Sequence, residues 1–143
     1  MAQRPLSREE NRRGPTIRER KKTTTERGYG WDWQRLREGF IAKYRLCTLC
    51  LCRGRSVLGR VVDHVEPHKG NDTLRLEWRN LQTLCPQCHA ADKQAIEQEV
   101  SPVSVTRRWR DYLLAEIEKA GAQEHVRCLG LPPSLAGVLL DVP

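Results

Sequence analysis

The fold of this chain is decided by a stretch that contains two short runs, Val62-Asp63-His64-Val65 and Asn80-Leu81-Gln82-Thr83-Leu84-Cys85-Pro86-Gln87-Cys88-His89. Four cysteines in this region form two Cys-x-x-Cys pairs, Cys47 with Cys50 and Cys85 with Cys88. Each pair places two thiolates on one tight turn, so the two pairs together can supply a tetrahedral site for structural zinc. Inside that frame lie the side chains that we expect to carry the chemistry: Asp63, His64, Asn80 and His89.

The zinc ligand set has two alternatives. Cys52 could replace Cys47 or Cys50, but a two-residue spacer is the common geometry of zinc knuckles, and it favours Cys47 and Cys50. Cys52 is then a free thiol that behaves as a small apolar residue. His89 could complete a zinc site in place of a cysteine, although four thiolates already suffice.

Composition indicates a basic protein with a thin core. The chain has 143 residues, a net charge of +7 and 38% hydrophobic residues. Such a charge favours a polyanionic partner, and nucleic acid is the usual one. The N-terminus has no apolar signal segment, and no run approaches the roughly 18 apolar residues of a membrane span. We therefore expect no membrane association and a reducing cytoplasm, where paired cysteines indicate metal more often than disulfides.

Three segments are expected along the chain: a basic arm over 1–27, a central domain over 28–100, and a C-terminal helix and tail over 101–143. The arm holds nine Lys or Arg against four Glu, which is +5 of the total charge of +7. It has too few apolar residues to fold alone, so we expect it to be mobile when free. It either follows phosphates or is a solvated tail, and charge alone does not decide between the two.

The pattern of apolar residues predicts an α+β fold. A helix is expected over 32–44 with one buried stripe, strands over 60–65 and 80–84, and helices over about 89–99 and 106–120. The first stripe comprises Trp33, Leu36, Phe40, Ile41 and Tyr44. The last helix has the stripe Trp109, Leu113 and Ile117, with Gly121 as its C-cap and Arg107, Arg108 and Arg110 in its first turn. The centre of the chain therefore reads strand, loop, strand, helix.

The order Cys-x-x-Cys, Asp63-His64-Val65, and Asn80 to His89 resembles the HNH endonuclease family over roughly residues 27–98. The runs Arg27-Gly28-Tyr29-Gly30-Trp31 and Pro67-His68-Lys69-Gly70 also resemble the small stand-alone HNH nucleases of bacteriophages and prophages. One departure is visible, because the family usually has a lysine three residues after the last histidine. Here Lys93 lies four residues after His89.

The resemblance implies a ββα-metal nuclease core braced by a four-cysteine zinc site, with flanking N- and C-terminal helices. His64 is expected to be the general base, because an imidazole can be neutral at physiological pH and accept a proton from water. Asp63 and His89 would hold one divalent cation, Mg²⁺, Mn²⁺ or Ni²⁺, and the amide of Asn80 would fix an imidazole. DNA is the implied substrate, and a role in phage DNA packaging beside a terminase follows from the resemblance alone.

Five side chains are weaker candidates for contacts with nucleic acid: His68, Lys69, Lys93, Arg53 and Arg55. The competing class of protein is a zinc-ribbon-like module that binds nucleic acid or protein without cutting. Such a module needs the cysteines and the positive charge but has no use for Asp63, His64 or His89. Their presence favours the nuclease.

Overall fold

The two strands pair as an antiparallel hairpin at the centre of the fold. A computed structural model describes residues 21–23, 25–27 and 29–141. Strand β1 (Val61–His64) pairs with β2 (Leu81–Leu84), and the register places Asp63 opposite Gln82. Alternation along β1 buries Val62 and His64 on one face and leaves Val61 and Asp63 half-buried on the other. The predicted α+β fold is confirmed.

The helix after the hairpin begins earlier than predicted and contains a π turn. It consists of α4 (Pro86–Cys88), the π-helical turn η3 (His89–Lys93) and α5 (Gln94–Glu99). Proline is well suited to the first helical position, because the amide hydrogen it lacks would have no partner there. A π turn holds one residue more than an α turn, so it absorbs the extra residue between His89 and Lys93.

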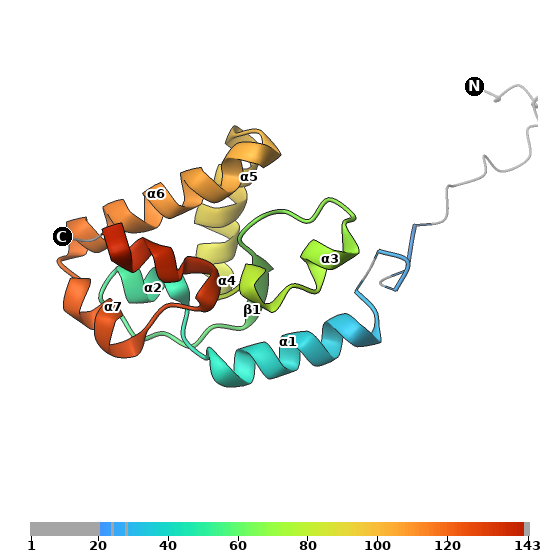
Figure 1. Cartoon of the computed structure of the whole chain (residues 1–143), viewed down its shortest axis with the longest axis horizontal. Coiled ribbons are helices and arrows are strands. Elements are labelled where there is room, and N and C mark those ends of the chain that lie inside the picture. Colours follow the sequence, from blue (N-terminus) through green and yellow to red (C-terminus); the bar gives the residue numbers. More distant parts are fainter. Residues whose placement is uncertain (1–20, 24, 28, 142–143) are drawn as a thin grey trace, which may run out of the picture.

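Helix α1 (Trp31–Lys43) covers one face of the hairpin, as its apolar stripe predicts. Trp33 and Phe40 are buried and pack with Val62 and Leu81 of the two strands. The partly buried side chains of this smaller core come from α1 and from the segments beside it: Tyr29, Leu36, Ile41, Tyr44 and Trp78. In Figure 1, α1 lies on one side of β1, and α5 and α6 lie on the other.

The opposite face is covered by α6 (Pro102–Ala120), whose buried stripe Trp109, Leu113 and Ile117 is confirmed. Gly121 ends the helix with φ of 60°, a left-handed conformation that favours glycine. The helix begins four residues before the predicted Thr106, again with proline in its first turn. The arginines expected in the first turn therefore lie beyond it, and Arg110 donates a hydrogen bond to the carbonyl of Ser134.

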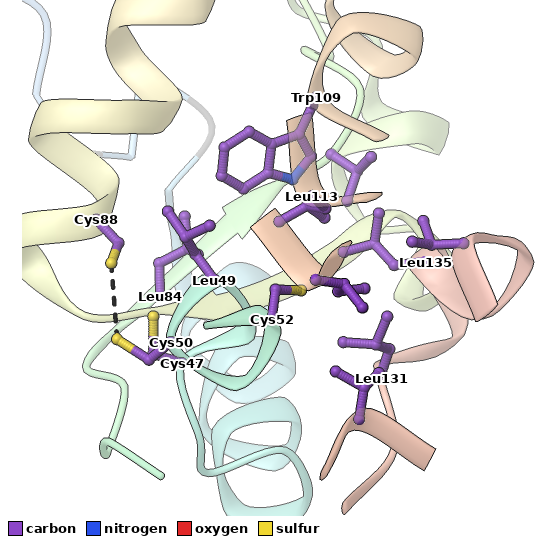
Figure 2. Close-up of a cluster of buried hydrophobic side chains, with 14 of the residues drawn as sticks. Cys47, Leu49, Cys50, Cys52, Leu84, Cys88, Trp109, Leu113, Leu131 and Leu135 are labelled. Atoms are coloured by element: carbon purple, nitrogen blue, oxygen red, sulfur yellow. Dashed lines mark hydrogen bonds between the residues drawn. The ribbon is translucent and has the colours of Figure 1, made fainter. Parts of the chain in front are cut away.

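The C-terminal segment completes the larger core. Helix α7 (Gln123–Leu129) and the 3₁₀ segment η4 (Pro133–Asp141) follow α6. Their contribution to the core consists of Val126, Leu131, Leu135 and Val138, which pack with the cysteines and the α6 stripe (Figure 2). The sequence predicted only a tail after the last helix, yet this segment is built into the core.

Three short elements connect these parts. Helix α2 (Thr48–Cys52) contains Cys50 and directly follows Cys47, while α3 (Asp72–Arg75) and η2 (Trp78–Asn80) lie in the connection between the strands. Gly59 passes so close to β2 that a Cβ there would lie 2.1 Å from Cγ2 of Thr83. In the described part of the chain, no helix is long and apolar enough to cross a membrane. Most of the predicted basic arm, 1–20 and 24, lies outside the described residues.

Candidate active site and metal centre

The two cysteine pairs meet in one cluster. All four sulfur atoms lie within 4.8 Å of one another, and the four side chains are buried: Cys47, Cys50, Cys85 and Cys88. Sulfur atoms around a tetrahedral zinc ion are about 3.8 Å apart, given a Zn–S bond of about 2.3 Å. The sulfurs of Cys50 and Cys88 are 3.7 Å apart (Figure 2). The cluster therefore fits a structural zinc ion.

The thiols of the cluster differ in how readily they ionise: although burial opposes it, hydrogen bonds within the cluster lower the pKa of Cys85, whereas the pKa values of two other thiols are raised. Burial and the neighbouring Cys47 raise the pKa of Cys50 to about 11, and burial raises the pKa of Cys88 as well. Such thiols ionise at neutral pH only when a metal ion stabilises the thiolates. Two guanidinium groups lie at the rim: Arg53 is 4.0 Å from the sulfur of Cys88, and Arg55 is 3.9 Å from that of Cys50.

Cys52 stays outside the cluster. It is fully buried in the larger core, and burial raises the pKa of its thiol to about 12. It therefore behaves as a small apolar residue, as the sequence indicated. All six cysteines of the chain lie in the described part and are unbridged.

Arg53 joins α2 to the two helices that pack against it. Its guanidinium forms ion pairs with Asp92, at 3.1 Å, and with Glu116, and it donates a hydrogen bond to the hydroxyl of Tyr112. The hydroxyl of Tyr112 donates in turn to Asp92. These contacts occupy Arg53 within the protein, which leaves little of it for the nucleic-acid contact suggested from sequence.

The candidate cation site lies between β1 and the π turn. Oδ1 of Asp63 and Nε2 of His89 are 3.9 Å apart, and both side chains retain some exposure to solvent. Carboxylate and imidazole ligands lie about 2.0 to 2.2 Å from a divalent cation, so two ligand atoms of one ion are at most about 4.4 Å apart, and the observed 3.9 Å lies within that limit. The structure thus brings together the two residues that the sequence assigned to the metal.

Sequence reasoning missed two further groups that meet Asp63 at its other oxygen. The amide nitrogen of Gln82 lies 3.2 Å from Oδ2, and the ammonium of Lys93 lies 3.5 Å from it. Lys93 is completely buried and also pairs with Glu97. Its ammonium faces carboxylates inside the protein, so this placement offers no phosphate contact.

His64 lies on the other face of β1, as strand alternation requires. Its ring stacks on Trp33, with the ring centroids 4.9 Å apart, and its Nε2 lies 2.9 Å from the carbonyl oxygen of Arg75. A carbonyl only accepts, so Nε2 carries the hydrogen and Nδ1 keeps its lone pair. Burial lowers the pKa of His64, which keeps the imidazole neutral at physiological pH. The ring is therefore prepared to accept a proton at Nδ1.

Asn80 acts on the loop rather than on an imidazole. Its Oδ1 accepts from the amide of Glu66, and its Nδ2 donates to the carbonyl oxygens of Glu66 and Leu74 at 2.9 and 3.3 Å. These bonds tie the two ends of the connection between the strands. Leu74 adjoins Arg75, whose carbonyl holds His64, so Asn80 supports the candidate base indirectly through the backbone.

The loop candidates lie beside His64. The ring of His68 is 4.8 Å from that of His64, and its Nδ1 accepts from the amide of Gly70. Burial lowers the pKa of His68, so this ring is also neutral. Lys69 has a positive φ of 47°. His68 thus lies next to His64, and Lys69 follows it on the exposed part of the loop.

A hairpin followed by a helix, with a carboxylate facing an imidazole and four clustered cysteines beside them, forms an arrangement of the ββα type. The comparison with protein families agrees: the family model described as HNH endonuclease matches residues 47–94. This part of the chain is an HNH endonuclease domain. No curated protein and no solved structure matches the chain.

Proposed function

We propose that this protein is a metal-dependent DNA endonuclease that hydrolyses phosphodiester bonds with His64 as general base. The observation that carries the proposal is the placement of Asp63 and His89, whose ligand atoms lie 3.9 Å apart beside the strand that presents His64. A zinc-ribbon-like binding module has no use for this pair. The net charge of +7 is consistent with a DNA substrate.

In this proposal His64 takes the proton of the attacking water at Nδ1. Its hydrogen bond to Arg75 fixes the tautomer, and the loop held by Asn80 fixes the position of that carbonyl. Asp63 and His89 would hold the divalent cation, Mg²⁺, Mn²⁺ or Ni²⁺, which supplies positive charge for the charge developing on the phosphate and leaving oxygen. His68 and Lys69 are positioned to bind a neighbouring phosphate oxygen.

Cleavage of supercoiled plasmid, with EDTA as control, tests the activity, and three variants test the roles. His64→Ala should lower the rate by about a hundredfold or more, since general-base catalysis typically contributes 10² to 10⁴. His89→Ala and Asp63→Ala should lose activity through weaker metal affinity. Excess Mn²⁺ should then restore part of their rate but none of the rate of His64→Ala, because excess metal refills a weakened site but cannot replace a proton acceptor.

If excess Mn²⁺ restored the rate of His64→Ala but not that of the other two variants, the assignments of the base and of the metal ligand would be reversed. A parent protein that binds DNA but never cuts it under these conditions would favour the non-catalytic binding module. The resemblance to stand-alone phage nucleases extends the proposal to phage DNA processing with a terminase as partner. Co-purification of the two proteins from infected cells tests that extension.

A further inference from the structure

A buried amide connects the core of the protein to the candidate cation site. Gln82 lies in the middle of β2, directly opposite Asp63 of β1, and its side chain is completely buried. Its Oε1 accepts a hydrogen bond of 2.9 Å from the indole nitrogen of Trp109, and its Nε2 donates one of 3.2 Å to Oδ2 of Asp63. Burying an amide is unfavourable unless both of its ends are paired, and here they are.

The indole determines which end of the amide faces the carboxylate. The N–H group of Trp109 can only donate, so it must meet the amide oxygen of Gln82. The NH₂ group is therefore turned toward Asp63, where it finds an acceptor. In the opposite orientation two N–H groups would face each other at Trp109, and the amide oxygen would face the carboxylate. One buried donor in α6 thus fixes the polarity of the amide in β2.

Lys93 acts on the same carboxylate oxygen. Its ammonium lies 3.5 Å from Oδ2, and Glu97 holds it from the next turn of the helix. Oδ2 therefore has two donors within the protein, while Oδ1 is the oxygen that faces Nε2 of His89. This arrangement presents one oxygen of Asp63 to a cation and keeps the other for the protein.

We propose that Gln82, oriented by Trp109, is a positioning residue that makes Asp63 a one-oxygen ligand of the divalent cation. The inference rests on the proposed function only in placing the cation at Asp63 and His89. The chain Trp109–Gln82–Asp63 links the larger core to the site through two hydrogen bonds. Without it, only the longer contact of 3.5 Å to Lys93 restrains Oδ2, so the carboxylate gains freedom about its side-chain torsions and Oδ1 is held less firmly opposite His89.

The test measures Mn²⁺ affinity directly, from the paramagnetic resonance signal of the free ion in titrations of the zinc-loaded protein. Gln82→Leu keeps the size of the side chain but removes the hydrogen bond, and we expect it to weaken Mn²⁺ binding by about 10- to 100-fold. Trp109→Phe removes the indole donor and should weaken binding in the same direction. In cleavage assays, Gln82→Leu should raise the Mn²⁺ concentration for half-maximal rate and keep the rate at saturating Mn²⁺ near that of the parent.

Thr83→Val provides the matched control. Thr83 is equally buried in the same strand, and its hydroxyl donates to the carbonyl of Tyr44 rather than toward the cation site. Its loss should lower the melting temperature without changing Mn²⁺ affinity. Asp63→Ala defines the signal expected when the site is lost.

Each outcome separates the inference from the proposed function. Mn²⁺ affinity of Gln82→Leu equal to that of the parent, or an equal loss in Thr83→Val, overturns the positioning role. Mn²⁺ binding that is weakened in Gln82→Leu but not in Thr83→Val supports the positioning role. This holds even if the parent cannot cut DNA, and in that case only the proposed function fails. If Asp63→Ala binds Mn²⁺ as well as the parent does, or the parent binds none, both the inference and the proposed function are overturned.

Discussion

The neutral state of His64 comes from its contacts within a few ångströms. The ring lies against Trp33 and is only 7% exposed, and this burial lowers its pKa. A cation on the neighbouring Asp63 would lower the pKa further, because a positive charge disfavours the imidazolium. Since the folded-state pKa lies below the unfolded value, the stability associated with the neutral ring is fully present above the unfolded pKa of about 6.5 and is lost as pH falls from there through the lowered pKa.

The lowered pKa of His64 predicts how the rate of cleavage depends on pH. The rate of the parent should fall on the acid side below the ordinary histidine pKa of about 6.5. Trp33→Ala opens the ring of His64 to water, so the acid limb should move to higher pH, toward that value. Single-turnover rates measured at saturating Mn²⁺ between pH 5 and 8 would show the shift.

Trp78→Ala is the control for this experiment. Trp78 belongs to the same core but packs on Phe40 and Tyr44, not on His64. The Trp78→Ala variant should lower the stability of the protein and leave the acid limb of the pH–rate profile at the pH of the parent. If both variants shift the limb equally, or neither shifts it, the stacking of Trp33 does not set the pKa of His64.

At the scale of single residues, the sequence indicated the candidate site residues but not the groups that hold them in place. Asp63, His64, Asn80 and His89 were found from order and spacing, whereas Gln82 and Lys93 were not recognised as partners of Asp63. Gln82 meets Asp63 only through the register between strands, which no spacing along the chain reveals. One signal was present: a buried Trp109 needs an acceptor for its indole N–H, and the buried strands hold few polar side chains.

The helical elements carry the clearest departure from the expected pattern. The π turn over His89–Lys93 places His89 and Lys93 on the same side, where both reach Asp63. An α-helix would hold the same pair with one residue fewer between them, which is the spacing usual in the family. Single π turns of this kind are frequent at functional sites.

Deletion of Ala91 should therefore convert the π turn to α-helix and keep both side chains at Asp63. Ala91 is exposed, so its loss removes no core contact. We expect the variant to fold with a free energy of unfolding within about 1 kcal/mol of the parent, and to retain zinc and Mn²⁺ binding. Circular dichroism during denaturation and Mn²⁺ titration provide the measurements.

Deletion of Ala115, an exposed residue of the regular helix α6, is the matched control. A deletion there rotates the rest of the helix by about 100° and turns its buried stripe away from the core, since each residue of an α-helix occupies that angle. This variant should unfold or become insoluble. If both deletions lower the stability of the protein equally, the π turn does not accommodate an inserted residue.

Two helix starts were placed too late along the sequence for one physical reason. These helices were expected to start at about residues 89 and 106, yet Pro86 and Pro102 begin them in the structure. Proline stops a helix from its interior but begins one well from its first turn. The apolar stripes of α1 and α6 were predicted correctly, because periodicity depends on the buried positions alone.

The cysteine cluster lies where the main parts of the molecule meet. Cys47 and Cys50 belong to the segment before the hairpin, and Cys85 and Cys88 follow β2. The surrounding core includes side chains of α6, α7 and η4. The segment after residue 123 was not expected from any pattern, because its few apolar residues become meaningful only when the core they complete is known.

From this position we expect a zinc ion to decide whether the whole molecule folds. Structural zinc contributes on the order of 10 kcal/mol or more, which equals or exceeds the stability of most small domains. Cys85→Ser leaves three thiolates for the ion and should give unfolded or insoluble protein. Cys52→Ser leaves all four thiolates and should fold with full zinc content, at a cost of about 1 to 3 kcal/mol for a hydroxyl placed in the apolar core.

Metal analysis and thermal denaturation of the purified variants, with and without a strong chelator, decide the matter. The parent and Cys52→Ser should each contain one zinc per chain and lose their cooperative transition when the ion is removed. Loss of zinc from Cys52→Ser would place Cys52 among the ligands in spite of the sulfur positions. A well-folded parent without zinc would show that packing alone holds the two halves of the core together.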